Sequence, residues 1–455
     1  MGEASRRAAL LAVTLGSFLT PFMGSSLNTA LPTIASEFGL DAVATSWLAT
    51  VYLLSSAIFL VPFGRLADMY GRKRVFVGGI LVYSASSFVC AFSPSSLVLT
   101  LLRIPQGLGG AMIFGTGIAI LTSVYPSESR GMVLGVNSAS VYLGLSLGPF
   151  LGGVLTQHLS WRSIFLVNCS MGVFILVVSV LRLKGEWAED EKKRLDLPGA
   201  VLYSLTLAVG VYGLNSLPET AGVVLTVSSI LPAIAFVKVE GSQGNPMLNL
   251  RLFKDNRVFA FSSLAALMNY SASFSVTFLL SLHLQLIKSL SPQQAGLVLL
   301  SAPAVQAVFS PFAGRLSDRR EPRTISSLGM GLTSMALLSF AAMLPDANVE
   351  ATVMVLILLG VGLALFASPN TNAVMGSVPR HQYGIASSLV GTMRILGQLL
   401  SMAAVALVFV LFMGRVQVTE NYGLFSQSVR TAFTFFGLLC AGGIYFSLAR
   451  GKANS

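Results

Sequence analysis

Long apolar stretches alternate with short polar segments along the whole chain. A helix that crosses the hydrocarbon core of a bilayer needs about 20 mostly apolar residues. Fourteen stretches meet this requirement, and we expect a membrane-spanning helix at each, because a backbone exposed to lipid must satisfy its hydrogen bonds within its own segment. The predicted spans are 8–31, 45–67, 75–93, 97–122, 132–157, 162–183, 197–214, 221–237, 257–283, 291–313, 323–344, 351–374, 384–413 and 428–449.

The composition agrees with this pattern. Of the 455 residues, 54% are hydrophobic and only 10% are charged, whereas soluble domains carry about 25% charged residues. So few charges cannot coat a surface that faces water. The sequence therefore predicts an all-α membrane protein.

Lys and Arg are unevenly divided between the two sides of the predicted bundle. In a 14-span topology, 23 of the 29 Lys and Arg residues lie on the side of the N-terminus, four lie on the other side, and Arg103 and Arg394 lie within spans. Cytoplasmic loops carry the excess of positive residues, so we expect both termini to be cytoplasmic. The net charge of +11 then reflects topology. A nucleic-acid partner is not expected, because the cations do not cluster with interleaved aromatic residues.

The chain contains an internal repeat. The segment GRLAD at 64–68 follows the second span, and GRLSD at 314–318 follows the tenth. Likewise, 123–131 follows the fourth span and 377–384 follows the twelfth, both beginning Ser-Val and ending in Gly. Both pairs are eight spans apart, which predicts two six-helix halves separated by two inserted helices. The predicted units are an N-terminal bundle at 1–183, a linker with the inserted helices at 184–256, and a C-terminal bundle at 257–455.

Five motifs resemble, in order and in context, those of the major facilitator superfamily, and specifically its fourteen-span drug:proton antiporter (multidrug efflux) family. They are LNTALPTIA at 27–35, GRLADMYGRKRVF at 64–76, LLRIPQGLGGAMIFG at 101–115, GLSLGPFLGG at 144–153 and WRSIFLVN at 161–168. The resemblance covers nearly the whole chain. It implies the major facilitator fold and a secondary transporter of the cell membrane that exports hydrophobic or amphipathic compounds in exchange for protons, by alternating access.

The resemblance also implies a conformational latch in the loop after the second span. Asp68 is expected to engage Arg72 and the N-terminus of a neighbouring helix, where an anion is favourable. Gly64 would let two backbones approach closely, and Gly314 with Asp318 would form a weaker second copy. The alternative is that the cations of this loop only anchor the topology.

The fifth span carries the antiporter motif of the resembled family. Its small residues and helix-bending proline are Gly144, Gly148, Pro149, Gly152 and Gly153. Such a surface lets two helices slide in close contact, as alternating access requires. The alternative is tight packing without motion.

Two arginines lie within predicted spans. An arginine at mid-span costs about 2.5–3.5 kcal/mol on insertion scales, so we expect both to face the bundle interior. The resemblance links Arg103 to hydrogen bonds within the N-terminal half and to proton transfer, and the alternative is a structural arginine that ties the first and fourth spans together. Arg394 poses the same question, and we favour a structural role.

The resemblance places the first-span aspartate of the family at Met23, which cannot titrate. The other acids lie in loops or at span ends, with Asp68 and Asp318 at the cytoplasmic boundary. A cavity without a fixed anion favours neutral, zwitterionic or anionic amphipaths over organic dications. Candidate cavity residues, from spans that line the cavity in the superfamily, are Asn28, Gln106, Met112, Phe114, Asn137, Tyr142, Asn269, Tyr270, Phe274, Gln306 and Asn370.

Other classes of function find little support in the sequence. The chain has no HExxH or Walker motif, no Ser/His/Asp set and no loop long enough to form a soluble domain, so we do not expect an enzyme or a receptor. Cys90, Cys169 and Cys440 lie in apolar stretches and are interpreted as buried hydrophobes. We expect no cofactor or metal, and as partners a small-molecule substrate, protons and the lipid bilayer, with the protein a monomer. An importer or facilitator of a metabolite without proton antiport is the alternative.

Overall fold

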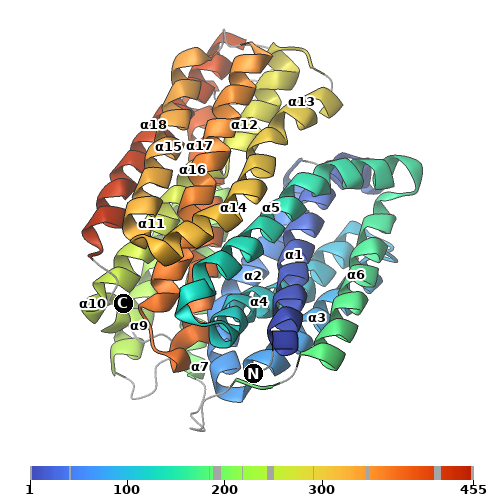
Figure 1. The fold of residues 1–455 in the computed structure, drawn as a ribbon. Helices are drawn as coiled ribbons and strands as arrows, with labels where there is room; N and C mark the ends of the chain where they lie inside the picture. Colours follow the sequence, from blue (N-terminus) through green and yellow to red (C-terminus); the bar gives the residue numbers. More distant parts are fainter. Residues whose placement is uncertain are drawn as a thin grey trace.

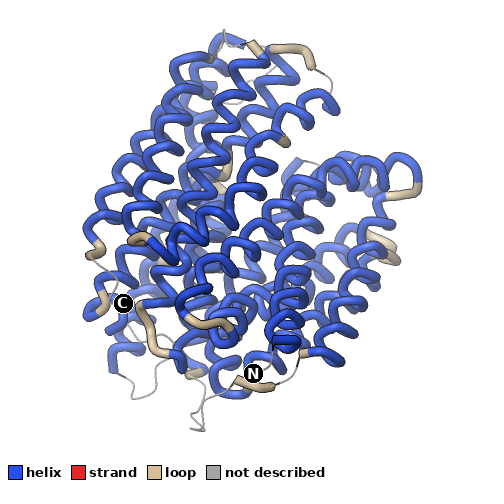
Figure 2. Tube along the Cα trace, viewed as in Figure 1, coloured by secondary structure: helices blue, strands red, loops and turns tan. Residues whose placement is uncertain are grey.

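The structure is a computed structural model of the full chain. It describes residues 3–39, 42–183, 185–187, 196–217, 219–242, 251–290, 292–344, 348–413 and 422–451. Within these residues all regular structure is helical (Figure 2), and 14 helices are long and apolar enough to cross a membrane. The predicted fold class and number of spans are therefore confirmed.

The first six helices form one bundle (Figure 1). They are α1 (Glu3–Phe38), α2 (Ala42–Tyr70), α3 (Arg72–Cys90), α4 (Ser96–Val124), α5 (Ser127–His158) and α6 (Trp161–Arg182). Their shared apolar core includes the fully buried side chains of Met23, Phe76, Tyr83, Trp161 and Phe165. Met23 thus lies inside the bundle.

The last part of the chain forms a second bundle (Figure 1). It consists of α11 (Arg257–Ser273), α12 (Val276–Leu282), the π-helix η1 (His283–Ile287), α13 (Pro292–Leu299), α14 (Ser301–Arg319), α15 (Pro322–Met343), α16 (Val349–Gly376), the 3-10 helix η2 (Arg380–Gln382), α17 (Tyr383–Met413) and α18 (Tyr422–Ala449). A separate apolar core lies within it. Its first helix begins where Asn256 accepts the Phe259 N–H at 2.9 Å, which satisfies one of the free donors of a helix start.

Two predicted spans of this bundle are interrupted, which corrects the expectation of continuous helices at 257–283 and 291–313. The first is interrupted between α11 and α12, where the Ser275 N–H donates to the Ser401 hydroxyl at 3.1 Å. The second breaks at Leu300, because Pro303 has no N–H and its ring conflicts with the carbonyl four residues earlier, at the end of α13. Both breaks depend on proline chemistry or tertiary contacts that hydropathy does not register.

Three helices lie between the bundles in sequence: α7 (Leu197–Asn215), α8 (Thr220–Ser228) and α9 (Ile230–Ser242), followed by the short α10 (Arg251–Asp255). The predicted span at 221–237 is thus divided at Ser229. Helix α7 packs on the outside of α2, where the Tyr203 hydroxyl donates to the Ala57 carbonyl at 3.1 Å. The apolar side chains of α8 and α9 are mostly exposed, as expected for helices that face lipid.

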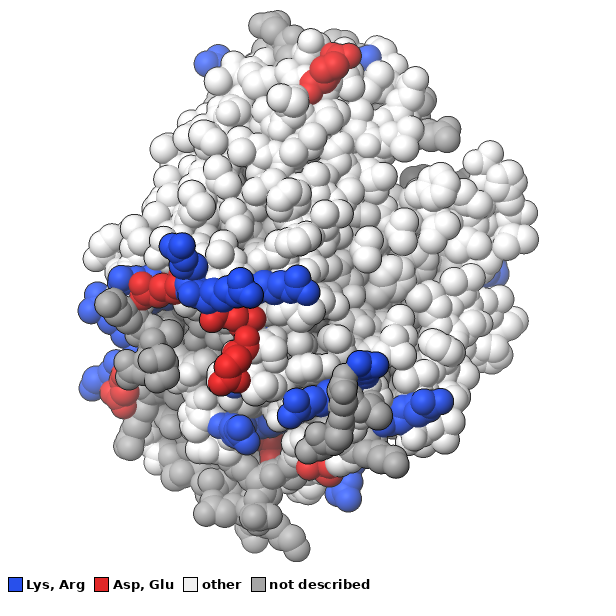
Figure 3. All heavy atoms as spheres, viewed as in Figure 1, with Lys and Arg blue, Asp and Glu red and all other residues white. Residues whose placement is uncertain are grey.

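The two bundles touch at one end and separate at the other (Figure 1). At the end where both termini lie, α17 packs on α2 and α4, and α5 packs on α14 and α16. An apolar cluster from α2, α4, α7, α16 and α17 fills part of this contact. Figure 3 shows Lys and Arg gathered towards this end and a broad uncharged surface above it, hollowed between the bundles. We refer to these two ends as the closed end and the open end.

Glu37 ties α1 to α6 at the open end. Arg162 donates two hydrogen bonds to its carboxylate, at 2.6 and 3.0 Å, and the Trp161 indole donates a third at 2.6 Å. Hydrogen bonding by the Arg162 guanidinium holds the pKa of Glu37 below its usual value. The pair is about one-third exposed, so solvent weakens the interaction.

Replacing Glu37 with glutamine is expected to destabilise the protein by about 1 kcal/mol at neutral pH, because the exposed ion pair contributes little and the bond from Trp161 is weakened. Since the pKa of the folded carboxyl is lowered, the difference is fully present above the ordinary carboxyl pKa. It disappears as the pH falls through the folded pKa. Thermal denaturation from pH 7 downwards measures it. Glu350→Gln, at an exposed acid that begins α16, is the matched control, and equal behaviour of the two variants at pH 7 would contradict the assignment.

Candidate functional site

Asp68 joins the two bundles at the closed end. Its carboxylate is fully buried and accepts two hydrogen bonds from Arg72, at 2.7 and 3.0 Å. It also accepts the backbone N–H groups of Gly384 and Ile385, at 2.9 and 3.0 Å. These two residues lie in the first turn of α17, where the positive end of the helix dipole favours an anion. We call this the first inter-bundle contact.

Arg72 extends this contact to two further elements. Its guanidinium donates to the Ser123 hydroxyl at the end of α4 and to the Arg380 carbonyl in η2, each at 2.6 Å. The arginine is 5% exposed. Charged hydrogen bonds of this kind are among the strongest in proteins, so Arg72 and Asp68 together join α2, α3 and α4 to η2 and α17.

Asp318 makes the mirror contact from the second bundle. Its carboxylate accepts the Gly131 N–H at 2.6 Å and the Met132 N–H at 2.9 Å, near the start of α5. Within the described part of the chain, no arginine bonds to Asp318, which fits a weaker copy of Asp68. We call this the second inter-bundle contact. The acid in the last turn of α2 or α14 thus binds the repeated helix start of the other half.

Glycines allow these contacts to form. A Cβ on Gly64 would come within 2.7 Å of the Ser388 Cβ and 2.8 Å of the Gly384 carbonyl. A Cβ on Gly314 would come within 2.7 Å of the Gly131 backbone. Real Cβ atoms do not approach so closely, so the bundles can meet here only without side chains at these positions.

The sequence analysis missed Tyr383, which lies between the two contacts. The guanidinium carbons of Arg72 and Arg130 lie 5.5 and 5.7 Å from the centre of its ring, and Arg130 donates to its hydroxyl at 3.2 Å. Arg130 and Tyr383 each directly precede the glycine that ends one copy of the repeat. Aligning the two copies of the repeat residue by residue could therefore have identified both side chains from the sequence.

The glycines of the fifth span face α1. A Cβ on Gly144 would lie 2.6 Å from the Phe18 carbonyl, and one on Gly152 would lie 2.7 Å from the Ser26 Cα. A Cβ on Gly148 would meet the Ser25 side chain, while the neighbouring Gly153 has only the Thr29 methyl at 3.7 Å. Pro149 lies inside the same helix. The motif is thus a close backbone contact within the first bundle, and its role in motion stays a prediction.

Arg103 lies inside the first bundle and has partners on two helices. It is 1% exposed, donates to Gln106 and to the Leu48 carbonyl, and lies 4.4 Å above the Tyr52 ring. Gln106 in turn donates to the Ser87 hydroxyl at 2.7 Å. The network joins α2, α3 and α4. The predicted partner helix α1 does not supply these bonds.

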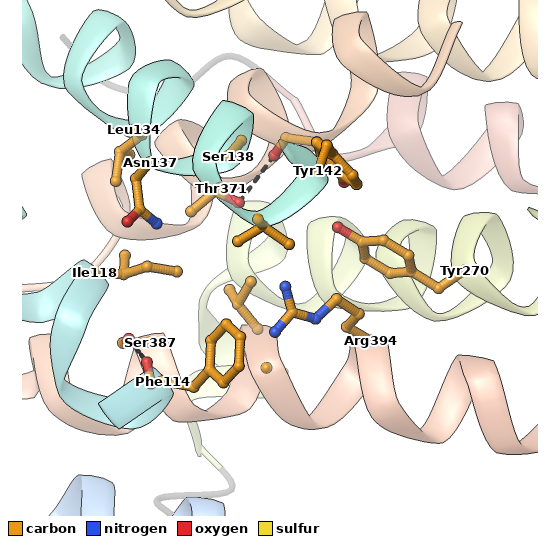
Figure 4. A pocket seen from close by; sticks show the side chains of 14 residues that line it. Phe114, Ile118, Leu134, Asn137, Ser138, Tyr142, Tyr270, Thr371, Ser387 and Arg394 are labelled. Atoms are coloured by element: carbon orange, nitrogen blue, oxygen red, sulfur yellow. Dashed lines mark hydrogen bonds between the residues drawn. The ribbon is translucent and has the colours of Figure 1, made fainter. Parts of the chain in front are cut away.

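A small pocket lies between the bundles, one turn along α17 from the first inter-bundle contact (Figure 4). It encloses about 40 Å³, enough for a few water molecules but far below the ~300–1,000 Å³ of sites for drug-sized ligands. A larger ligand therefore requires the bundles to move apart. The lining residues are Phe114, Ile118, Leu134, Asn137, Ser138, Val141, Tyr142, Tyr270, Ala367, Thr371, Ser387, Val390, Gly391 and Arg394.

Of the eleven predicted cavity residues, Phe114, Asn137, Tyr142 and Tyr270 line this pocket, whereas Gln306 is buried in α14 and does not line it. Arg394, predicted separately, also lines it. Its guanidinium carbon lies 4.4 Å from the centre of the Phe114 ring. Phe114 belongs to the first bundle and Arg394 to the second, so this stacking crosses the interface.

The other predicted cavity residues lie elsewhere. Met112 packs on Gly79 within the first bundle, where Gln106 is also bonded. Asn269 and Asn370 are buried in the second bundle. Asn28 and Phe274 are exposed and do not line the pocket.

Asn370 belongs to a site that the sequence analysis did not anticipate. Arg450, at the end of α18, is 1% exposed and donates to Asn370, Ser262 and Ser326, at 2.8, 3.0 and 3.2 Å. The sequence interpretation counted Arg450 among the loop cations because it follows the last apolar stretch. In the structure it fastens α11, α15, α16 and α18 together.

The cysteines and His283 make no part of the pocket or of the two inter-bundle contacts. Cys90 and Cys440 are buried and Cys169 is half-buried, all as free thiols. His283, in η1, is buried. Among the described residues, no three His, Cys, Asp or Glu side chains are arranged to hold a metal ion.

Two six-span bundles and two further spans between them in sequence make up the described chain. The bundles meet through repeated contacts around an interface pocket, an arrangement that defines a polytopic protein of the secondary-transporter type. The sequence model of the Major Facilitator Superfamily matches residues 13–402, and again residues 262–453. The chain belongs to the major facilitator superfamily of transporters, in its drug-efflux-type family.

Two relatives and one solved structure illustrate the comparison. The riboflavin transporter RibZ of Clostridioides difficile (strain 630) is 29% identical over 388 residues, 85% of this chain and 84% of that protein. The multidrug resistance protein Stp of Mycobacterium tuberculosis (strain CDC 1551 / Oshkosh) is 30% identical over 403 residues, 87% of this chain and 74% of that one. The proton:xylose symporter XylE has the same fold, with a TM-score of 0.73 at 13% identity over 99% of this chain and 97% of its own.

Proposed function

We propose that this protein is a secondary transporter of the cell membrane that exports hydrophobic or amphipathic small molecules in exchange for protons, by alternating access. The observation that carries the proposal is the pair of inter-bundle contacts, which hold one end closed while the bundles separate at the other. Relatives named as a riboflavin transporter and a multidrug resistance protein support a small-molecule substrate.

The orientation follows from the charges. Lys and Arg gather towards the closed end (Figure 3), and positive residues accumulate on the cytoplasmic side. Both termini are then cytoplasmic, and the conformation described here opens to the outside. Export requires a second conformation, in which both inter-bundle contacts are broken and the pocket opens to the cytoplasm.

The two contacts also suggest where protons act. Asp68 and Asp318 bind helix starts as anions, and they become accessible from the cytoplasm when the closed end opens. Protonation removes the charge that the N–H groups bind and so opposes reclosure, whereas release of the proton favours it. Arg103 is already bonded within one bundle, so we assign it a structural role.

Inverted membrane vesicles test this proposal. With an acidic lumen, we expect vesicles containing the protein to accumulate fluorescent probes such as riboflavin (neutral) or fluorescein (anionic) in preference to ethidium (cationic). Accumulation should stop when an ionophore collapses the pH gradient and should be absent from vesicles without the protein. Accumulation that survives the ionophore would exclude proton antiport and favour a facilitator.

A further inference from the structure

Arg394, which is half-buried at the interface, differs in its partners from the buried Arg103 and Arg450. Arg103 and Arg450 each donate hydrogen bonds to several groups of their own bundle. No described residue gives Arg394 a hydrogen bond or an ion pair, and its guanidinium carbon lies 4.4 Å from the centre of the Phe114 ring. A guanidinium carries five N–H donors. Arg394 therefore presents unused donors to the pocket.

The surroundings of Arg394 contain no described anion that neutralises it. None of the lining residues is acidic. The two acids of the interface, Asp68 and Asp318, are held at the starts of α17 and α5. A cation in such a place is costly unless it is paired, so an anion that enters the pocket gains an attraction that the protein itself leaves unsatisfied.

The rest of the lining is suited to an aromatic body with polar substituents. Figure 4 shows the Arg394 guanidinium between the Phe114 ring and the Tyr270 hydroxyl. Tyr142 in α5 lines the pocket from the other side of the interface. The amide oxygen of Asn137 is buried without a hydrogen-bond donor among the described residues. The pocket thus offers aromatic faces, one free acceptor and one free cation.

We propose that Arg394 binds the anionic group of an amphipathic aromatic substrate, a carboxylate, sulfonate or phosphate, whose ring packs against Phe114, Tyr142 and Tyr270. This inference rests on the proposed function, because it names the substrate class of the same transporter. Arg394 then determines specificity, and its stacking on Phe114 holds the guanidinium ready for the anion in the free protein.

Binding of 2-naphthalenesulfonate and of its neutral isostere, 2-naphthalenesulfonamide, to the purified full chain tests the proposal by calorimetry. We expect the sulfonate to bind at least about tenfold more tightly, since a hydrogen-bonded charge pair is worth one to two powers of ten in affinity. Arg394→Gln should abolish this preference and leave sulfonamide binding within about twofold. Arg394→Lys, which keeps the charge, should retain part of it.

Two further variants test whether the pocket itself binds the probes and whether loss of a positive charge elsewhere changes their binding. Phe114→Leu should weaken binding of both probes. Arg430→Gln removes an exposed cation in the third turn of α18 and should change the binding of neither probe. Undiminished sulfonate preference in folded Arg394→Gln would overturn the proposal, as would preference of the unaltered protein for the sulfonamide. If the vesicle assay succeeds and the sulfonate does not bind, this inference alone fails, whereas failure of the vesicle assay with every probe contradicts the proposed function.

Discussion

Replacing Asp68 with asparagine is expected to release the closed end and reduce transport to a small fraction of the unaltered level. The substitution removes an anion that two guanidinium nitrogens and two helix N–H groups bind, and it leaves Arg72 buried without a counter-charge. Breaking a buried ion pair by removing one partner costs roughly 3–5 kcal/mol. On that scale the closed arrangement loses about two to four powers of ten in population relative to the alternative conformation.

A cysteine at Ser388 reports on this change. Ser388 is fully buried in α17 against Gly64, so an introduced thiol reacts with a water-soluble maleimide only when the closed end opens. In a background with Cys90, Cys169 and Cys440 replaced, Asp68→Asn should raise the labelling rate at least tenfold.

Glu128→Gln is the matched control for this experiment. Glu128 is an exposed acid in the first turn of α5, at the same end of the molecule. This control should leave both labelling and transport unchanged. Slow labelling together with full transport in Asp68→Asn would show that the first inter-bundle contact does not hold this end closed.

Replacing Gly152 with valine is expected to destabilise the first bundle by about 2–3 kcal/mol, near the upper limit usually seen for overpacking. The new side chain would enter the backbone of α1 at Ser26, which lies 2.7 Å from the position of a Cβ. A backbone cannot rotate out of the way as a flexible side chain can. Thermal denaturation of purified protein, followed by the loss of monodisperse material, measures the effect.

Gly153→Val is the matched control, one residue along the same helix. Its Cβ would meet only the Thr29 methyl, at an ordinary 3.7 Å, so we expect a change within about 0.5 kcal/mol. If both variants lose stability equally, the effect reflects the propensity of valine in a helix, and close contact with α1 is not its cause.

Much of the fold could be predicted because lipid leaves the backbone few choices. Each apolar stretch of sufficient length had to be a helix, and the uneven distribution of Lys and Arg supplied the number of spans. Breaks within spans were not predictable in the same way. Those at Ser275 and Leu300 arise from a serine contact across the bundle and from a proline in the following turn, neither of which alters hydropathy.

The sequence predicted the charged residues of the candidate site better than their binding partners or the cavity residues. Asp68 and Arg72 stood out because charge is rare in such a chain, but their binding partners are backbone N–H groups, which have no signature in a sequence. Residues that line the cavity were harder to predict, since the interior of a bundle and its interface with the other bundle are similar in polarity. Asn370 and Gln106 therefore looked like cavity residues, although each binds an arginine inside its own bundle.

The use of main-chain donors in both inter-bundle contacts makes the two sides of each contact unequal under mutation. Almost any substitution of Asp68 or Asp318 removes the acceptor. On the receiving side, the donors at Gly384, Ile385, Gly131 and Met132 belong to the peptide backbone, and only proline abolishes them. A saturation scan should thus find the acids intolerant of nearly every replacement. Ile385 and Met132 should accept most side chains but not proline, and the two glycines should be limited by size.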